Sequence, residues 1–120
     1  MENKITNEQR KLIFAILKDL RSAKRDLIIS LNGILTPIPI YTLSAEDARN
    51  LLKILDLDYP RDKAGKPKSM AAGQMTTTEV NNHIKWLELT AAESHIPLRH
   101  FEAEMERLSN FSGADTVFNG

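Results

Sequence analysis

The sequence predicts a mainly α protein, a compact bundle of about four helices, and leaves open a short β-hairpin within residues 27–38. Apolar residues recur every three or four positions in four segments, which is the spacing of one helix face. Two of these segments open with a capping box, in which a Thr and a Gln or Glu three residues later satisfy free backbone N–H groups. The chain has 120 residues, 42% hydrophobic and 27% charged, which suits one globular domain with a modest core.

The first helix is predicted from about Asn7 to at least Arg25. Thr6 and Gln9 form the capping box at its start. The apolar positions that follow at helical spacing are Leu12, Ile13, Ile16, Leu17, Leu20, Ala23, Leu27 and Leu31.

The end of this helix has two interpretations. Asn32-Gly33 is typical of a helix C-cap, and it is equally typical of the turn of a hairpin that pairs 27–31 with 34–38. Pro37 and Pro39 make a poor second strand, because proline lacks the N–H that a ladder needs. We therefore favour the C-cap and expect an extended apolar connector after it.

Three more helices are predicted further along the chain. Ser44 opens the second, and the capping box of Thr76 and Glu79 opens the third. Ile96-Pro97 ends or bends the third helix, and the fourth follows. Their apolar faces consist of Ala48, Leu51, Leu52 and Leu55; of Val80, Ile84, Leu87 and Ala91; and of Leu98, Phe101, Met105 and Leu108.

We expect one helical domain over 1–110, with a mobile basic loop at 56–74 and a frayed tail at 111–120. The absence of Cys excludes a disulfide scaffold and thiol chemistry. The longest uncharged stretch holds Gly and two Pro and is no membrane helix, and the first residues lack the apolar part of a secretory signal, so a cytoplasmic location is expected.

Basic residues gather on one side of the first predicted helix, within an arc of roughly 140°. The chain as a whole is neutral, so only this local grouping favours a polyanion such as nucleic acid. A solvated face of an ordinary amphipathic helix is the alternative interpretation. An aromatic set for base stacking is missing, since only Phe14 lies on this helix and only Tyr59 flanks the loop. The candidate nucleic-acid-binding residues are Arg10, Lys11, Lys18, Arg21, Lys24 and Arg25 on the helix and Arg61, Lys63, Lys66 and Lys68 in the loop.

No catalytic or cofactor motif stands out, so the sequence predicts neither an enzyme nor a cofactor. Glu79 and His83 share a helix face and form the nearest approach to a metal site, but HExxH is absent and no Cys is present. The nucleophile elbow of hydrolases and the glycine-rich phosphate loops are also missing. His95 is expected to stabilise a helix C-terminus as a cation.

Trp86 and Leu89 give the third predicted helix a second apolar face. Such a helix is either buried on both sides or meets a partner. A chain of this size often gains core by self-association, so a homodimer is a further expectation.

Two blocks carry a resemblance to phage proteins. Residues 7–20, NEQRKLIFAILKDL, are similar to a helix of the phage Orf (NinB) recombination-mediator family and resemble the helical part before the HNH module of certain phage nucleases. Residues 75–98 resemble a later helix of the same proteins, and the two blocks together cover about a third of the chain. The leading β-region of the family and the HNH residues have no counterpart here, and His95 stands where glycine is expected.

The resemblance implies a non-enzymatic phage or prophage accessory protein that binds single-stranded or branched DNA during recombination. Arg10, Lys11 and Lys18 would be the first contacts to test. The alternative is a small phage-encoded module that binds and inhibits a host protein or defence complex, through Trp86 and Leu89 or through the apolar 34–41 segment.

Overall fold

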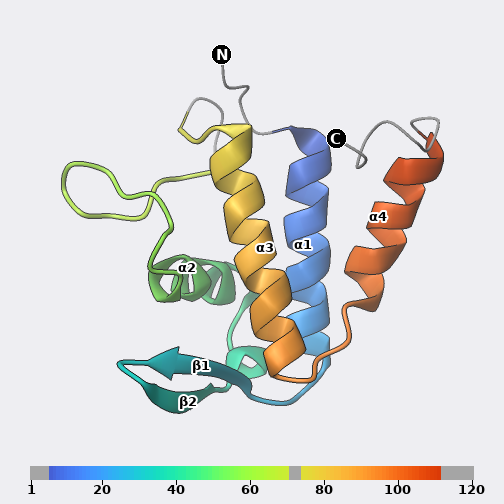
Figure 1. Cartoon of the computed structure of the whole chain (residues 1–120). Coiled ribbons are helices and arrows are strands. Elements are labelled where there is room, and N and C mark those ends of the chain that lie inside the picture. The colour runs from blue at the N-terminus through green and yellow to red at the C-terminus, as the bar shows by residue number, and fades with distance from the viewer. Residues whose placement is uncertain (1–5, 71–73, 112–120) are drawn as a thin grey trace.

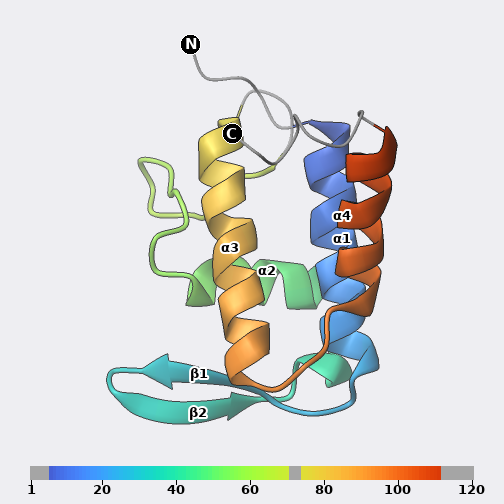
Figure 2. The same cartoon turned by 45° about the vertical axis from the view of Figure 1, so that its right-hand side comes forward.

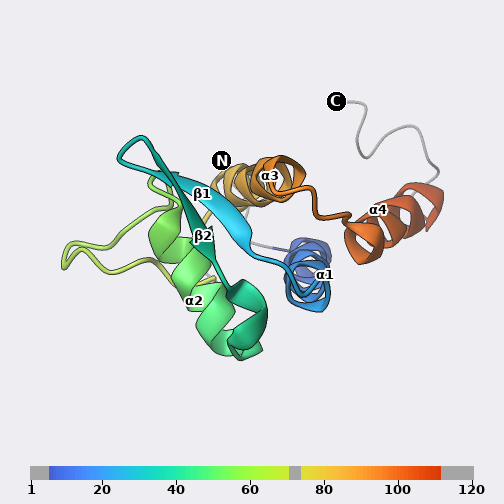
Figure 3. The same cartoon turned by 90° about the horizontal axis from the view of Figure 1, so that it is seen from below.

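Helix α1 (Asn7–Ser22) runs through the middle of the protein, and the other three α-helices pack against it. The computed structural model describes residues 6–70 and 74–111 (Figure 1). The predicted fold class is confirmed: helices α1, α3 and α4 run roughly side by side, α2 lies across them, and a two-stranded hairpin covers one end (Figures 2 and 3). The remaining elements are β1 (Leu27–Leu31), β2 (Ile34–Ile38), the 3-10 helix η1 (Ile40–Thr42), α2 (Ala45–Leu55), α3 (Thr77–Glu93) and α4 (Arg99–Phe111).

Both predicted capping boxes are confirmed. The Gln9 backbone N–H donates to Thr6 Oγ1 at 3.1 Å, and the Thr6 N–H donates to Gln9 Oε1 at 3.0 Å. Thr76 and Glu79 make the same pair of bonds at the start of α3. The Gln9 side chain also donates to the Thr77 carbonyl at 3.0 Å, so the start of α1 is tied to the start of α3.

The prediction that the first helix reaches Arg25 is wrong. The helix ends at Ser22, and Lys24 adopts the left-handed conformation with φ +54°. This turn lets the chain reverse and enter β1, whose first residue, Leu27, is fully buried. Burial of the strand residues outweighs the local periodicity that favoured a longer helix.

The C-cap interpretation of Asn32-Gly33 is also wrong, since these residues form the hairpin turn. Their φ angles of +54° and +81° are both positive, as a type I′ turn requires. Pairs in an antiparallel ladder alternate between bonded and non-bonded, and counting from the turn places Pro37 opposite Ile28 in a non-bonded pair. Pro37 therefore removes no ladder bond, while the outward Ile28 N–H donates to Ser94 Oγ at 2.8 Å.

Helix α3 ends before Ile96-Pro97, as predicted. The Ile96 N–H donates to the Ala91 carbonyl at 2.9 Å and the His95 N–H donates to the Ala92 carbonyl at 3.1 Å, which together form a Schellman motif. His95 has φ +58°, the left-handed geometry that favours glycine. The strain of this position explains why glycine is the expected residue there.

The core forms where the apolar faces of the helices meet β1 and η1. All four predicted face residues of α3, and Phe101 and Leu108 of α4, are buried.

The described part of the predicted 56–74 loop is closed by backbone hydrogen bonds between 60 and 68 and between 62 and 66. Residues 71–73 of that loop, and the predicted tail beyond Phe111, lie outside the described residues. None of the helices within the described ranges has the length and apolar character to cross a membrane.

Candidate functional site

Helices α1 and α2 enclose a groove lined by five basic side chains. It consists of two adjoining pockets of about 200 and 340 Å³ that share Phe14 and Arg49. No Asp or Glu is among the described residues that line either pocket. The basic groove, as we name it, comprises Phe14 and the cations Arg10, Lys18, Arg21, Arg49 and Lys53.

The local sequence of each helix places these side chains on the groove. Arg10, Lys18 and Arg21 fall on one side of α1 at about 100° per residue, next to its apolar face. Arg49 and Lys53 are four residues apart on α2 and therefore share a face. The burial of Ala48 and Leu52 against the core sets the rotation of α2 and turns this basic face toward α1.

The charges of the groove are not cancelled by carboxylates. Within the described residues, the one ion pair that a Lys or Arg makes is between Arg107 and Glu104, away from the groove. Neutral acceptors hold two of the arginines: Arg10 Nη2 lies 3.5 Å from the Met70 carbonyl oxygen, and Arg21 Nε donates to the Leu43 carbonyl at 3.1 Å. These contacts fix the guanidinium groups and leave their charge available to an anion.

Lys53 is the most buried of the five cations, with 9% of its surface exposed. Its Nζ lies 5.8 Å from the centroid of the Tyr59 ring. Burial lowers the pKa of Lys53, and the neighbouring Arg49 cation lowers it further. Partial burial and the Arg49 cation thus both disfavour the charged form of Lys53.

Phe14 provides the aromatic surface of the groove. It is 55% exposed although it lies among residues that cover the core, and it borders both pockets. An exposed ring flanked by cations is the combination that stacks on a base while neighbouring phosphates are neutralised.

The other basic residues predicted on the first helix lie outside the groove. Lys11 is exposed and does not line either pocket of the groove. The hydrogen bond from Arg107 lowers the pKa of Glu104 on α4, and the charge of Lys11 adds a smaller contribution in the same direction. Lys24 and Arg25 follow the end of α1, and Arg25 Nη1 donates to the His95 carbonyl at 3.0 Å.

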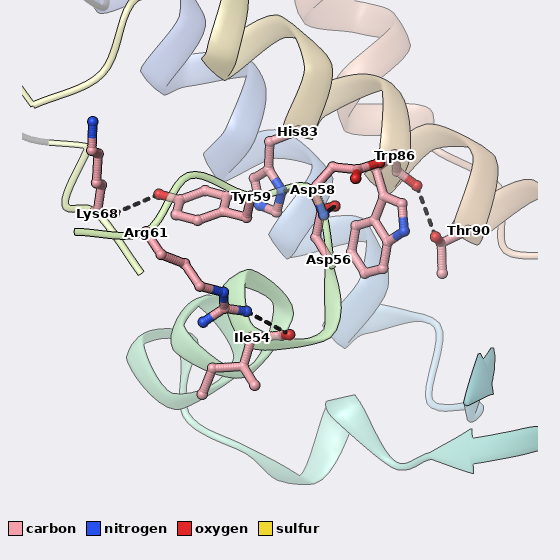
Figure 4. A network of polar contacts seen from close by, with 9 residues as sticks. All are labelled: Ile54, Asp56, Asp58, Tyr59, Arg61, Lys68, His83, Trp86 and Thr90. Carbon is pink, nitrogen blue, oxygen red and sulfur yellow. Dashed lines mark hydrogen bonds and ion pairs between the residues drawn. The ribbon is translucent and has the colours of Figure 1, made fainter. Parts of the chain in front are cut away.

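The predicted basic residues of the loop do not line the groove either. Arg61 Nη2 donates to the Ile54 carbonyl at 3.2 Å, and the Lys68 carbonyl accepts the Tyr59 hydroxyl at 2.7 Å (Figure 4). Lys63 and Lys66 are exposed in the turn between them. The structure therefore brings together three of the ten predicted basic residues, all from α1.

Arg49 and Lys53 are groove residues that the sequence reasoning missed. The sequence does contain a pattern that indicates them: two basic residues at i and i+4 stand beside the apolar positions of α2. A helix with a single apolar face normally turns such residues to solvent, so nothing local indicated that they would face α1.

A second cluster lies on the other side of Tyr59, and in it His83 pairs with Asp56 and not with Glu79. His83 Nδ1 lies 2.7 Å from Asp56 Oδ2, and both residues are buried (Figure 4). The Tyr59 ring meets the His83 ring edge-on, with 4.7 Å between the ring centroids. The Trp86 ring lies nearly parallel to the His83 ring, with 5.9 Å between the centroids. Glu79 caps α3 in place of pairing with His83, and no group of three or more His, Asp or Glu within the described residues could hold a metal ion.

The two predicted partner residues of α3 differ in their surroundings. Trp86 is partly buried against the core, whereas Leu89 is 59% exposed. Trp86 does not line the basic groove; it lines two other pockets, both together with Asp56 and Asp58. No protein-family model, curated protein or solved structure matches this chain.

Proposed function

We propose that this protein binds single-stranded nucleic acid in the basic groove, without catalysing a reaction. The observation that carries the proposal is the set of five groove cations, none ion-paired within the described residues, around the exposed ring of Phe14. Phosphates would be held by the cations and one base would stack on Phe14, with little reading of base identity.

The length of the groove suits a short single strand. Arg10 and Arg21 are eleven residues apart along α1, which at about 1.5 Å per residue is roughly 16 Å. A single strand is more extended than a duplex strand, which rises about 3.4 Å per nucleotide, so this distance accommodates only a few nucleotides. A duplex would keep its bases inside and leave Phe14 without a partner, so single strands are favoured. The phage recombination setting remains a prediction from the sequence resemblance.

Fluorescence anisotropy with labelled single-stranded and duplex DNA over a series of KCl concentrations tests the proposal. Each phosphate contact contributes about −0.7 to the slope of log K against log salt for single strands, so five contacts give a slope near −3.5. The double variant Lys18→Glu/Arg49→Glu should lower the affinity for single strands at least tenfold. Lys24→Glu/Lys63→Glu is the matched control, since it makes the same change in charge outside the groove.

A Phe14→Ala variant separates stacking from charge. It should weaken single-strand binding by about 1–3 kcal/mol, the range measured for base–aromatic stacking, and leave any duplex binding nearly unchanged. Absence of binding to both forms of DNA at 50 mM KCl, or equal effects of the groove and control variants, would overturn the proposal.

A protein partner is the second candidate. Leu89, Leu57, Ile34 and Leu35 are all more than half exposed, and large apolar side chains in such positions can serve as contacts. If DNA binding fails, a pull-down with wild-type protein and a Leu89→Ser variant is the next experiment.

A further inference from the structure

One end of the basic groove is a small pocket in which three of the five cations come together. The smaller pocket, of about 200 Å³, gathers Arg10, Arg49 and Lys53 around Phe14. The 69–70 segment lines the same pocket, and the Met70 carbonyl oxygen lies 3.5 Å from Arg10 Nη2. The larger pocket, by contrast, continues along α1 past Lys18 to Arg21.

The low exposure of Lys53 distinguishes this pocket from an ordinary basic surface patch. The residue is 9% exposed, and within the described residues its ammonium group has the Tyr59 ring near it, 5.8 Å from the ring centroid, but neither a carboxylate nor a hydrogen-bond acceptor. Because no buried side-chain nitrogen or oxygen of the described residues lacks a partner, this ammonium group reaches the solvent in the pocket while its aliphatic stem is buried. Its charge is therefore available to an anion that enters the pocket from outside.

We propose that this pocket binds a phosphate monoester, specifically the terminal phosphate of a nucleic-acid strand whose remaining nucleotides lie along the basic groove. The inference rests on the proposed function for the source of the phosphate. A monoester carries close to two negative charges at neutral pH, whereas an internal phosphodiester carries one. Two guanidinium groups and an ammonium group around one small pocket match the more highly charged group, and arginine can bind two of its oxygens at once.

The first experiment compares one oligonucleotide sequence with a 5′-phosphate, a 3′-phosphate and hydroxyl groups at both ends. Wild-type protein should bind one of the two phosphorylated forms at least fivefold more tightly than the hydroxyl form. Lys53→Met, which keeps an unbranched side chain only one atom shorter and removes the charge, should reduce this ratio to about one. Arg49→Gln provides a second variant at a less buried position, and Lys63→Met outside the groove should leave the ratio unchanged.

The second experiment uses inorganic phosphate and adenosine monophosphate as probes, with the Lys53 side-chain resonance followed by NMR at constant ionic strength. Both probes should shift this resonance, and Arg49→Gln should weaken the effect. If oligonucleotides bind but all three forms bind equally, the terminal-phosphate inference is overturned and the proposed function stands. If no oligonucleotide binds but the small phosphates shift Lys53, the proposed function fails and the pocket is a site for free phosphate monoesters. If neither occurs, both proposals are overturned.

Discussion

The Asp19 carboxylate, on α1, accepts a hydrogen bond of 3.0 Å from the backbone N–H of Phe101, in the first turn of α4. Its other oxygen accepts the His100 N–H at 3.0 Å and lies 2.6 Å from His100 Nδ1. No Ser, Thr, Asp or Asn precedes α4 in the sequence Ile96-Pro97-Leu98. A residue about eighty positions earlier thus performs the role of the N-cap, and places a negative charge at the positive end of the helix.

Asp19→Ala should therefore destabilise the protein by about 2 kcal/mol, since two backbone N–H groups lose their acceptor. Urea denaturation measures the loss, and hydrogen exchange should show faster exchange in α4 than in α3. Asp26→Ala removes an exposed carboxylate near the end of α1 and serves as the control, with an expected change within about 0.5 kcal/mol. Equal effects of the two variants would contradict the capping role.

The buried pair of Asp56 and His83 should behave as a coupled unit. Asp56→Ala leaves His83 without its partner and should cost roughly 3 kcal/mol. A double-mutant cycle with His83→Ala should give a coupling energy above about 1 kcal/mol, because the second substitution removes a group already left unpaired. Additivity of the two single effects within about 0.5 kcal/mol would show that the 2.7 Å contact contributes little to stability.

Lys53→Met should stabilise the ligand-free protein, by about 0.5–1.5 kcal/mol, because it removes a partly desolvated charge that has no carboxylate partner within the described residues. Since the folded-state pKa of Lys53 is lowered, the unfolded chain binds more protons between that pKa and about 10.5, and wild-type stability rises with pH over this window. The advantage of the variant should accordingly shrink as the pH rises toward about 10.5. Urea denaturation at several pH values measures it, and a variant less stable than wild type at pH 7 would contradict the prediction.

The raised pKa of Tyr59 should make the free energy of unfolding fall at high pH. Burial raises the pKa of Tyr59, and the charges of Asp56 and Glu79 raise it further. The unfolded chain loses this proton first, at about pH 10, so the contribution of Tyr59 is complete below pH 10 and is lost above it, by up to about 1.4 kcal/mol per pH unit.

A Tyr59→Phe variant isolates this effect. At pH 8 it should be less stable by about 1 kcal/mol, because the hydrogen bond to the Lys68 carbonyl is gone. The difference between the two proteins should narrow from pH 9.5 to pH 11 in thermal or urea denaturation. A constant difference over that range would show that Tyr59 titrates alike in the folded and unfolded states.

Residues close in sequence explain what could be predicted for the fold. The starts of α1, α2 and α3 follow from Thr6, Ser44 and Thr76, since each cap bonds to a group three residues away. The end of α1 could not be located in this way. The left-handed Lys24 is selected by the burial of Leu27 in a strand that itself exists because Asn32-Gly33 turns the chain.

The basic residues of the candidate site also depend partly on local sequence and partly on packing. Periodicity alone placed Arg10, Lys18 and Arg21 on one side of a helix, and it grouped Lys11, Lys24 and Arg25 with them. Packing then separated the two sets, because α4 covers the side near Lys11 and the helix stops before Lys24.

The helices, most of their N-terminal caps and the apolar face of each follow from local sequence, because they depend on interactions within one or two turns. The packing of the elements is needed to see that Asp19 caps α4, that Arg49 and Lys53 face α1, and that the Lys53 charge has no carboxylate partner within the described residues. Those relationships join residues some 40 to 80 positions apart, and they form only when burial of the shared core fixes how each helix is rotated against the next.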